Sequence, residues 1–271
     1  ICPVIRSGCK KIVTTIFDMT AYRFPDTCQY SNLIVQRSLL RKTIRRSNFL
    51  LPISDFVSHE LTFFFSRVLK PDQVVVVPCG GPDWRLPDDY KEENRKEFLF
   101  FAGNLEPRKN LMRLIEALEK LNRTGLKVSL HIAGTEGWKN KKILEKINSS
   151  VVKNQIRFLG YLTEEDLKKQ YMSCKAVVYP SLYEGFGLPV LEAVSMNAPV
   201  ITSKSTVMEE VAGEYAIYVD PYDVDDIAAK ISCFYNQANK PSIDQHYKEH
   251  LISKYSWKKS ASRLLNLFKS I

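Results

Sequence analysis

Short apolar segments alternate with segments of helical length along most of this chain, and this alternation constrains its fold more than any other feature. The apolar segments predict strands at 97–103, 127–134, 156–160, 176–180, 199–202 and 216–219. Apolar spacing and start signals predict helices at 110–121, 139–148, 164–174, 208–212 and 224–235, and one that begins at Pro189. Such an alternation predicts the α/β class, a parallel sheet covered on both faces. These sheets bind ligands beyond the carboxyl ends of their strands.

The first 80 residues show the same alternation with fewer strands. Strands are predicted at 11–17, 49–53 and 73–78, with helices around Arg37–Arg46 and at 55–68, the second capped by Ser54. About three strands are too few for a complete nucleotide-binding sheet, whose halves usually supply about six. Turn-forming and charged residues from Gly80 to Glu97 indicate a linker. We therefore expect two domains, for which 271 residues are sufficient.

The net charge of +9 permits a nucleic acid, an anionic membrane face or a phosphorylated substrate as partner. The basic residues are mostly dispersed and no recognition motif accompanies them, so we expect no nucleic acid partner. The densest basic cluster interleaves Leu39, Leu40 and Ile44 with Arg41, Lys42, Arg45 and Arg46. Two interpretations stay open: an amphipathic helix in peripheral contact with an anionic membrane face, or a solvated helix face over the core.

Cysteine, histidine and hydropathy patterns argue against other classes of site. The cysteines show no C-x-x-C spacing and the histidines form no H-x-x-x-H set, so we expect neither a metal site nor a disulfide framework. No apolar stretch approaches the ~18 residues of a transmembrane helix, and no signal-peptide pattern is present. We expect a cytoplasmic protein, which the membrane interpretation would place at the inner face of the membrane.

The turn Gly103-Asn-Leu-Glu-Pro-Arg-Lys-Asn110 lies between a predicted strand and a predicted helix. Arg108 and Lys109 are adjacent cations at the start of that helix, where the helix dipole adds partial positive charge. A forked guanidinium beside an ammonium suits a diphosphate, which carries about two negative charges. An ordinary surface turn with two basic residues is the alternative.

A second turn follows the apolar run 176–180 and leads into a helix. Its glycines, and Pro189 at the expected first helical position, place unpaired backbone N–H groups of residues 186–188 beside a positive dipole end. Glu184 and Glu192 stand on either side of this point, and each carboxylate can accept two hydrogen bonds from sugar or ribose hydroxyls. The alternative is a helix with acidic residues in its first turn, although Glu192 lies within the helix beside apolar neighbours.

Both turns resemble the donor-site motifs of glycosyltransferase family 4. The second is similar to that family's E-x7-E pattern, here Glu184-Gly-Phe-Gly-Leu-Pro-Val-Leu-Glu192. The resemblance continues through Ala198-Pro-Val-Ile201, Glu210-Val-Ala-Gly213, Val219-Asp-Pro-Tyr-Asp223 and Tyr255-Ser-Trp257. It covers residues 96–271, with weaker similarity back to residue 11.

The resemblance implies the GT-B fold, in which two Rossmann-like domains enclose the active site. Residues 1–88 would form a partial N-terminal, acceptor-side domain and residues 89–251 the C-terminal domain that binds the nucleotide-sugar donor. Residues 252–271 would form a helix that packs back on the first domain. The N-terminal domain is expected to be incomplete, because family members have further residues before the segment that starts here.

The resemblance also implies roles for individual residues. Arg108 and Lys109 would hold the diphosphate, Glu184 would face the donor sugar, Glu192 the ribose, and the backbone near Tyr161 and Leu162 the base. The implied donor-binding residues are Gly103, Arg108, Lys109, Tyr161, Leu162, Glu184, Gly185, Phe186, Gly187, Leu188 and Glu192. The implied catalytic residues are Arg108, Lys109, Glu184 and Asp18. No metal and no cofactor is implied, because the nucleotide-diphosphate sugar is a substrate.

Three positions depart from the family pattern. Asn104 stands where many members have an arginine that also meets the diphosphate. Phe17-Asp18-Met19 and Arg23-Phe24-Pro25 resemble its H-D-L…R-F-P segment, with Phe17 at the histidine position and Asp18 retained. Asn197 stands where the family usually has glycine, and asparagine is the next best residue at positive φ.

The favoured hypothesis is a retaining, metal-independent glycosyltransferase acting in polysaccharide or lipopolysaccharide synthesis. It would move a hexose from a nucleotide-diphosphate sugar to a glycan or lipid-linked acceptor. The resemblance of the E-P-R-K-N variant favours a mannose-like sugar, with GDP-mannose as donor. The alternative hypothesis, which Phe17 favours, is a nucleotide-sugar-binding module without turnover.

Overall fold

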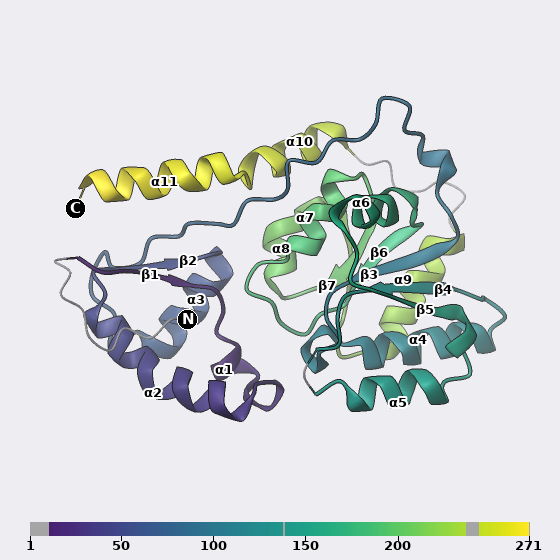
Figure 1. Ribbon diagram of the computed structural model, residues 1–271, viewed down its shortest axis with the longest axis horizontal. Helices are drawn as coiled ribbons and strands as arrows, with labels where there is room; N and C mark the ends of the chain where they lie inside the picture. The colour runs from purple at the N-terminus through teal and green to yellow at the C-terminus, as the bar shows by residue number, and fades with distance from the viewer. Residues whose placement is uncertain (1–10, 138, 237–243, 271) are drawn as a thin grey trace.

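The computed structural model describes residues 11–137, 139–236 and 244–270, which form two α/β units (Figure 1). The first unit contains β1 (Val13–Ile16), α1 (Thr20–Arg23), α2 (Tyr30–Arg46), β2 (Phe49–Pro52) and α3 (Asp55–Phe65). The second contains β3 (Phe98–Ala102), α4 (Leu111–Arg123), β4 (Ser129–Ala133), α5 (Lys141–Ser149), β5 (Ile156–Gly160), α6 (Glu164–Ser173), β6 (Ala176–Tyr179), α7 (Leu188–Ser195), β7 (Val200–Ser203), α8 (Val207–Ala212), β8 (Ala216–Val219) and α9 (Val224–Asn236). Two further helices follow, α10 (Gln245–Lys254) and α11 (Trp257–Ser270). Short 3-10 helices are η1 (Pro25–Thr27), η2 (Glu92–Asn94), η3 (Pro107–Lys109), η4 (Lys153–Gln155) and η5 (Gly213–Tyr215).

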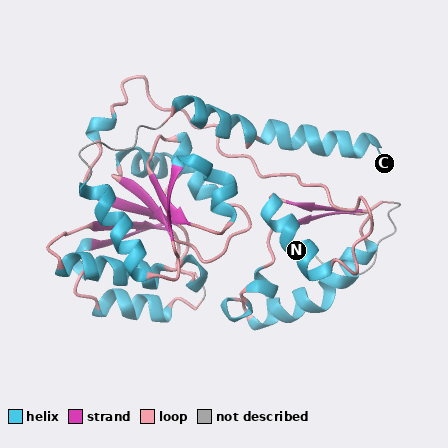
Figure 2. Ribbon diagram, turned by 180° about the vertical axis from the view of Figure 1, so that it is seen from behind, coloured by secondary structure: helices cyan, strands magenta, loops and turns pink. Residues whose placement is uncertain are grey.

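The larger sheet consists of parallel strands in the order β5-β4-β3-β6-β7-β8. Because β3 pairs with both β4 and β6, the chain fills one side of the sheet first and then crosses to fill the other. Helices cover both faces of this sheet, as Figure 2 shows in cyan around the magenta strands. Strands β3 and β6 are buried along their whole length, which explains their continuous apolar sequences. The predicted α/β class with parallel sheets is confirmed.

Two predicted helix starts are confirmed by their capping hydrogen bonds. Ser54 Oγ accepts from the Val57 N–H at 3.0 Å at the start of α3. Thr163 Oγ1 accepts from the Asp166 N–H at 3.2 Å at the start of α6. Each cap satisfies a backbone donor that has no partner within its helix, which typically contributes about 1 kcal/mol.

Asparagines occupy two left-handed backbone positions. Helix α4 begins at Leu111 and not at the predicted Asn110, because Asn110 has a φ of 63° that a right-handed helix excludes. Asn197 has a φ of 55°, as expected for a residue that replaces glycine in a turn.

The first unit contains a two-stranded parallel sheet of β1 and β2. The prediction of a regular strand at 73–78 is wrong. The segment runs beside β2, where Val75 donates to the Leu50 carbonyl at 2.9 Å and Val77 to the Pro52 carbonyl at 3.0 Å. Pro52 has no N–H that could donate to this segment, so the ladder of hydrogen bonds between the segment and β2 is interrupted. An isolated bridge at Leu50–Val74 remains.

Helix α2 is longer than the predicted Arg37–Arg46 segment and packs on the core with the apolar residues of that segment. Leu40 and Ile44 are buried and Leu39 is half-buried, whereas the basic residues of α2 are exposed. This is the arrangement expected of a solvated helix face. The exposed apolar residues of α2 lie nearer its start, at Tyr30, Ile34 and Val35.

The two units contact each other through the loops that follow β1, β2 and β6. The Met19 N–H donates to the Tyr183 hydroxyl at 2.9 Å, and Ser54 Oγ donates to the Gly185 carbonyl at 2.8 Å. The carboxylate of Glu210, on α8, accepts from the first two backbone N–H groups of α3 at 3.0 and 2.7 Å. The second unit therefore helps to cap a helix of the first.

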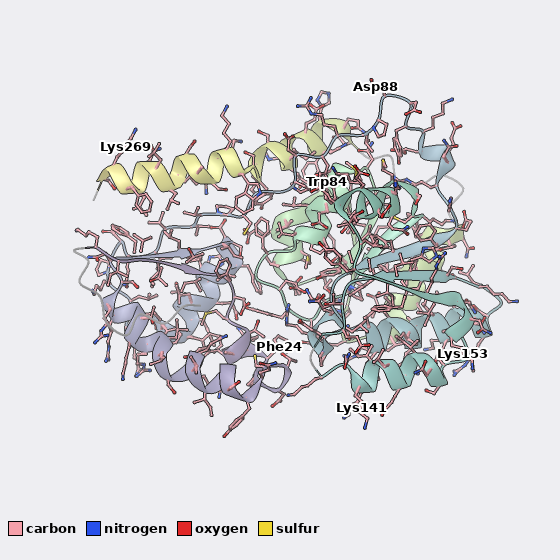
Figure 3. All side chains as sticks on the ribbon, viewed as in Figure 1. Phe24, Trp84, Asp88, Lys141, Lys153 and Lys269 are labelled. Carbon is pink, nitrogen blue, oxygen red and sulfur yellow. The ribbon has the colours of Figure 1, made fainter. Side chains whose placement is uncertain are left out.

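The segment 80–97 connects the units and runs beside α10 and α11 (Figure 1). A Cβ at Gly80 would overlap the backbone of Trp257, so this close approach requires glycine. Trp84, labelled in Figure 3, is anchored to the second unit through a 3.1 Å hydrogen bond from Nε1 to Glu164. Helix α11 lies along the first unit, where Ser260 Oγ donates to the Pro78 carbonyl at 2.6 Å. The domain boundaries at residues 88 and 251 stay predictions.

Candidate functional site

The two turns singled out in the sequence meet at the carboxyl ends of β3 and β6, neighbouring strands at the point where the strand order reverses. The Leu182 N–H donates to the Arg108 carbonyl at 2.9 Å and joins the turns directly. Asn110 Nδ2 donates to the carbonyls of Pro180 and Pro221 at 2.9 and 2.7 Å. In open α/β sheets, ligands bind at such a reversal point.

Glu184 is held by cations and hydroxyls from both turns. Its Oε2 accepts from Arg108 Nη1 at 2.5 Å, and its Oε1 accepts from Lys109 Nζ at 2.7 Å. Ser181 Oγ donates to Oε1 at 2.5 Å, and the Tyr179 hydroxyl donates to the same oxygen at 3.2 Å. We call Arg108, Lys109 and Glu184 the cation–carboxylate cluster. A sugar hydroxyl at Glu184 would share the carboxylate with these protein groups.

The cluster is largely buried, with side-chain exposures of 16% for Arg108, 13% for Lys109 and 11% for Glu184. Burial would raise the pKa of Glu184, but the charges of Lys109 and Arg108 outweigh burial and lower this pKa to about 2. Burial would lower the pKa values of both cations. At Arg108, the charge of Glu184 outweighs this effect of burial. At Lys109, Tyr179 and Glu184 together outweigh it. The pKa values of both cations are therefore raised.

All three groups of the cluster are therefore ionised at neutral pH, and their charges sum to +1. A second carboxylate, Glu106, lies with its Oε2 3.4 Å from Arg108 Nη2 and offsets this charge. A positive charge in a partly buried site interacts more strongly with an anion than it would in water. Guanidinium and ammonium groups also donate strong, charge-assisted hydrogen bonds to phosphate oxygens. The cluster thus supplies two cationic hydrogen-bond donors of the kind that bind a diphosphate.

The turn at residues 185–188 is packed between the two units. A Cβ at Gly185 would overlap the Phe17 carbonyl oxygen of the first unit, and Gly187 has a φ of 113°. Phe186 is buried against Tyr255, with ring centroids 5.4 Å apart. Helix α7 begins at Leu188, so the expectation of Pro189 as first helical residue is wrong by one position.

Glu192 lies on α7 and contacts a different partner. Its Oε2 accepts from the Tyr171 hydroxyl, on α6, at 2.6 Å. Burial raises the pKa of Glu192, and the hydrogen bond from Tyr171 only partly offsets this. The two carboxylates of the E-x7-E pattern are thus shifted in opposite directions.

The remaining predicted donor residues lie along the same edge of the sheet. Gly103 follows β3, and its N–H donates to the Ala133 carbonyl at 2.8 Å. Tyr161 and Leu162 follow β5, the edge strand, with Tyr161 81% exposed and Leu162 half-buried. Because β4 separates β3 from β5, these residues are spread along the edge instead of gathered at the cluster.

Asp18 follows β1 and faces the second unit across a polar cavity of about 360 Å³. Its Oδ1 accepts from the Thr20 N–H at 2.8 Å. The cavity is lined by Asp18, Thr20, Thr27, Cys28, Gln29 and Gln36 from the first unit and by Glu106 and Arg108 from the second. We call it the reaction cavity. The structure therefore brings Asp18 and Arg108, predicted from separate segments, to one space.

Phe17, at the position of the family's histidine, lines a different cavity. This apolar cavity of about 500 Å³ lies between the sheet of the first unit and α11, and Trp257 and Leu264 also line it. Phe17 is 54% exposed.

Sequence reasoning missed the hydroxyl partners of the cluster. Tyr179 ends a buried strand, where its hydroxyl requires a polar partner, so this signal is present in the sequence. No comparable signal marks Ser181. The same holds for Tyr183, which contacts the cluster through its backbone: the Tyr183 carbonyl accepts from Arg108 Nη1 at 2.5 Å. Tyr171, the partner of Glu192, comes from a helix that precedes β6 and is equally unmarked.

Other classes of site have no support among residues 11–137, 139–236 and 244–270. Within these ranges, no three His, Cys, Asp or Glu side chains are grouped as a metal ion would require. No helix there is long and apolar enough to cross a bilayer. Cys28, Cys79 and Cys174 are free thiols, whereas Cys2 and Cys9 lie outside the described residues.

Comparison with known proteins adds independent findings. The family model described as "Glycosyl transferases group 1" matches residues 83–249. O-antigen chain mannosyltransferase B of Escherichia coli is 28% identical over 268 residues, which cover 96% of this chain and 70% of that protein. The serotype-specific mannosyltransferase WbdA of Escherichia coli is 32% identical over 199 residues, which cover 68% of this chain and 22% of that protein. The chain thus spans only about a fifth of this second relative.

A solved structure matches both units of the chain. Anabaena HepE, in complex with UDP and glucose, superposes with a TM-score of 0.74 over 96% of this chain and 72% of its own, at 17% identity. This likeness concerns the fold.

Proposed function

Because this chain belongs to the group 1 glycosyl transferases and has the GT-B fold, we propose that it transfers a sugar from a nucleotide-diphosphate sugar to a glycan or lipid-linked acceptor. The names of the two Escherichia coli relatives described above are those of mannosyltransferases, and one of them refers to O-antigen chains. These names support a mannose-like hexose and a role in polysaccharide synthesis. If the transferred sugar is mannose, we expect GDP-mannose to be the donor.

One observation carries the proposal: the cation–carboxylate cluster places two adjacent cations, Arg108 and Lys109, at the reversal point of the sheet. In the proposed reaction the bond between the anomeric carbon and the diphosphate oxygen breaks, and the electron pair stays on the diphosphate. Arg108 and Lys109 stabilise the charge that develops there. Removing one preorganised donor group of this kind typically lowers the rate about 10²- to 10³-fold.

The acceptor side of the reaction is assigned to the reaction cavity. The acceptor hydroxyl oxygen bonds to the anomeric carbon from the face that the diphosphate leaves, so the anomeric configuration is retained. The hydroxyl proton passes to the departing phosphate oxygen. Asp18, which lines the same cavity as Arg108, orients the acceptor hydroxyl. Two protein cations at the diphosphate support a mechanism without a divalent metal.

Binding without turnover is the second candidate, and Phe17 favours it. A phenyl ring cannot donate or accept the hydrogen bonds of an imidazole, and Phe17 lines the apolar cavity under α11. The two candidates differ in a measurable product, since only the enzyme releases free nucleoside diphosphate.

The test incubates the purified chain with a panel of nucleotide sugars and a soluble α-mannoside acceptor in the presence of EDTA. The enzyme proposal expects acceptor-dependent release of nucleoside diphosphate, reduced about 10²-fold or more in Arg108→Met. Donor binding without release or transfer would support the binding module instead. Absence of donor binding would contradict both candidates.

Contact with a membrane face stays part of the proposal through α2. Its exposed basic residues are Arg37, Arg41, Lys42, Arg45 and Arg46, and α2 contains no acidic residue. Basic side chains near an anionic bilayer contribute about 1 kcal/mol each. Exposed Tyr30, Ile34 and Val35 add apolar surface at the start of the same helix. Such a contact would bring a lipid-linked acceptor to the protein.

A further inference from the structure

A second cavity, of about 330 Å³, lies between α1 and α3 of the first unit and the loops that follow β6, β7 and β8 of the second. We call it the aromatic cavity. Its lining shares no residue with that of the reaction cavity. Its volume is at the lower end of the range of small-molecule sites, about 300–1,000 Å³.

Aromatic rings form much of its wall. Phe24 and Phe56 pack against Tyr183 with ring centroids 5.5 and 5.8 Å away. Figure 3 shows Phe24 between the two units. Tyr222, in the loop that follows β8, is 58% exposed, and the Arg113 guanidinium lies 5.6 Å from its ring centroid. Aromatic faces provide apolar contact for ligands that are polar only at their rims, and the C–H faces of a sugar ring are such a surface.

Two ion pairs contribute all the charged groups of the lining. Arg23 pairs with Glu60 through two hydrogen bonds, and Lys204 Nζ lies 3.3 Å from Asp220 Oδ2. The charges of the lining cancel, so the cavity lacks the positive surplus that a phosphate requires. The side chains of Arg23, Lys204 and Asp220 are 41, 48 and 35% exposed. They can therefore donate to or accept from the hydroxyls of a neutral ligand.

The aromatic cavity adjoins the proposed catalytic machinery. Helix α1 lines the reaction cavity with Thr20 and the aromatic cavity with Arg23. Tyr183 lines the aromatic cavity, while its carbonyl accepts from Arg108 and the next residue is Glu184. Tyr183, in the wall of the aromatic cavity, is thus the sequence neighbour of Glu184 in the cation–carboxylate cluster. Arg108 of the same cluster lines the reaction cavity.

We infer that the aromatic cavity binds a sugar unit of the acceptor glycan, beyond the unit that receives the transferred sugar. The identity of this ligand as a glycan rests on the proposed function. Aromatic faces, balanced charges and exposed hydrogen-bonding groups together fit a neutral polyhydroxylated ring. The cavity then favours an acceptor of several sugar units over a single one.

The test uses α-linked mannotetraose and methyl α-mannoside as probes, titrated by NMR into the nucleotide-free protein. Tyr222→Ala removes an exposed aromatic face, and Tyr30→Ala is the matched control, a 78% exposed tyrosine on α2 outside the cavity. We expect the wild type to bind the tetraose more tightly than the monosaccharide. Tyr222→Ala should weaken tetraose binding about 3- to 10-fold, and Tyr30→Ala should not change it.

Lys204→Gln provides a second variant at a different wall of the aromatic cavity and should act in the same direction. In transfer assays both variants should raise the KM for the tetraose, with kcat and the KM for the donor unchanged. If the tetraose does not bind the wild type, or if neither variant changes its affinity, the inference is wrong. Donor binding and transfer are measured separately, so these results leave the proposed function standing. Loss of donor binding with tetraose binding intact would overturn only the proposed function.

Discussion

Glu184→Gln removes the negative charge of the cation–carboxylate cluster while preserving most of the side-chain shape. In the folded protein the pKa of Glu184 is about 2, compared with an ordinary value of 4.5. This difference corresponds to about 3 kcal/mol of preference for the charged form in the folded state. We therefore expect the variant to lose about 3 kcal/mol of the free energy of unfolding at pH 7. For a chain of this size, that loss lowers Tm by roughly 6–12 °C.

Glu192→Gln is the matched control, because it changes the other carboxylate of the same motif. Burial raises the pKa of Glu192, so its charge is disfavoured in the folded state. The neutral glutamine can still accept the hydrogen bond from Tyr171. We expect Tm at pH 7 to stay the same or to rise.

The pH dependence follows from the direction of the shift. Because the folded pKa of Glu184 is lowered, its stabilisation is fully present above pH 4.5 and is lost as the pH falls towards 2. The difference in Tm between wild type and Glu184→Gln should be constant between pH 7 and pH 5 and smaller at pH 3.5. Circular dichroism melts at these pH values measure it. Equal losses in Glu184→Gln and Glu192→Gln, or a Glu184→Gln melt within about 2 °C of wild type at pH 7, would mean that the charge of Glu184 does not stabilise the fold.

Other parts of the structure can be tested in the same way. Gly185→Ala places a methyl group on the Phe17 carbonyl oxygen, so urea denaturation should show a loss of about 2 kcal/mol; an unchanged midpoint would mean that the turn can shift. Asn110→Ala should be less stable in urea than Asn110→Gly by about 1 kcal/mol, since φ is 63° there, and equal stability would argue against strain. Replacing Arg41 and Arg45 together by glutamine should weaken co-sedimentation with anionic phosphatidylserine vesicles about 30-fold, whereas wild-type binding that is equal on neutral vesicles would exclude an electrostatic membrane contact.

Much of the fold was predictable because the signals are local. Apolar runs and helical spacing place the strands and helices of the second unit, with β5 and β8 matching the predicted bounds. The errors also have local causes that a pattern search overlooks. Pro52 interrupts the ladder beside residues 73–77, and the left-handed Asn110 delays the start of α4.

The site was predictable only in part. The sequence marks each of Arg108, Lys109 and Glu184 as a candidate. Their pairing depends on β3 and β6 being neighbours in the sheet. Because β4 and β5 lie between these two strands in the sequence, the sequence does not reveal that they are neighbours. The opposite pKa shifts depend on the charges of Lys109 and Arg108 at Glu184 and on the burial of Glu192. Burial and long-range contacts of this kind arise from tertiary packing, so no window of sequence contains them.

In the proposed function, the cation–carboxylate cluster binds the diphosphate of a nucleotide sugar. Calorimetric titration of GDP and UDP in EDTA tests it in the wild type, in Arg108→Met and in Lys153→Met, an exposed control with the same loss of charge (Figure 3). We predict that at least one diphosphate binds the wild type and Lys153→Met equally, and that Arg108→Met weakens it about 10- to 150-fold. Equal affinity in all three proteins, or binding that disappears with EDTA, would contradict the claim.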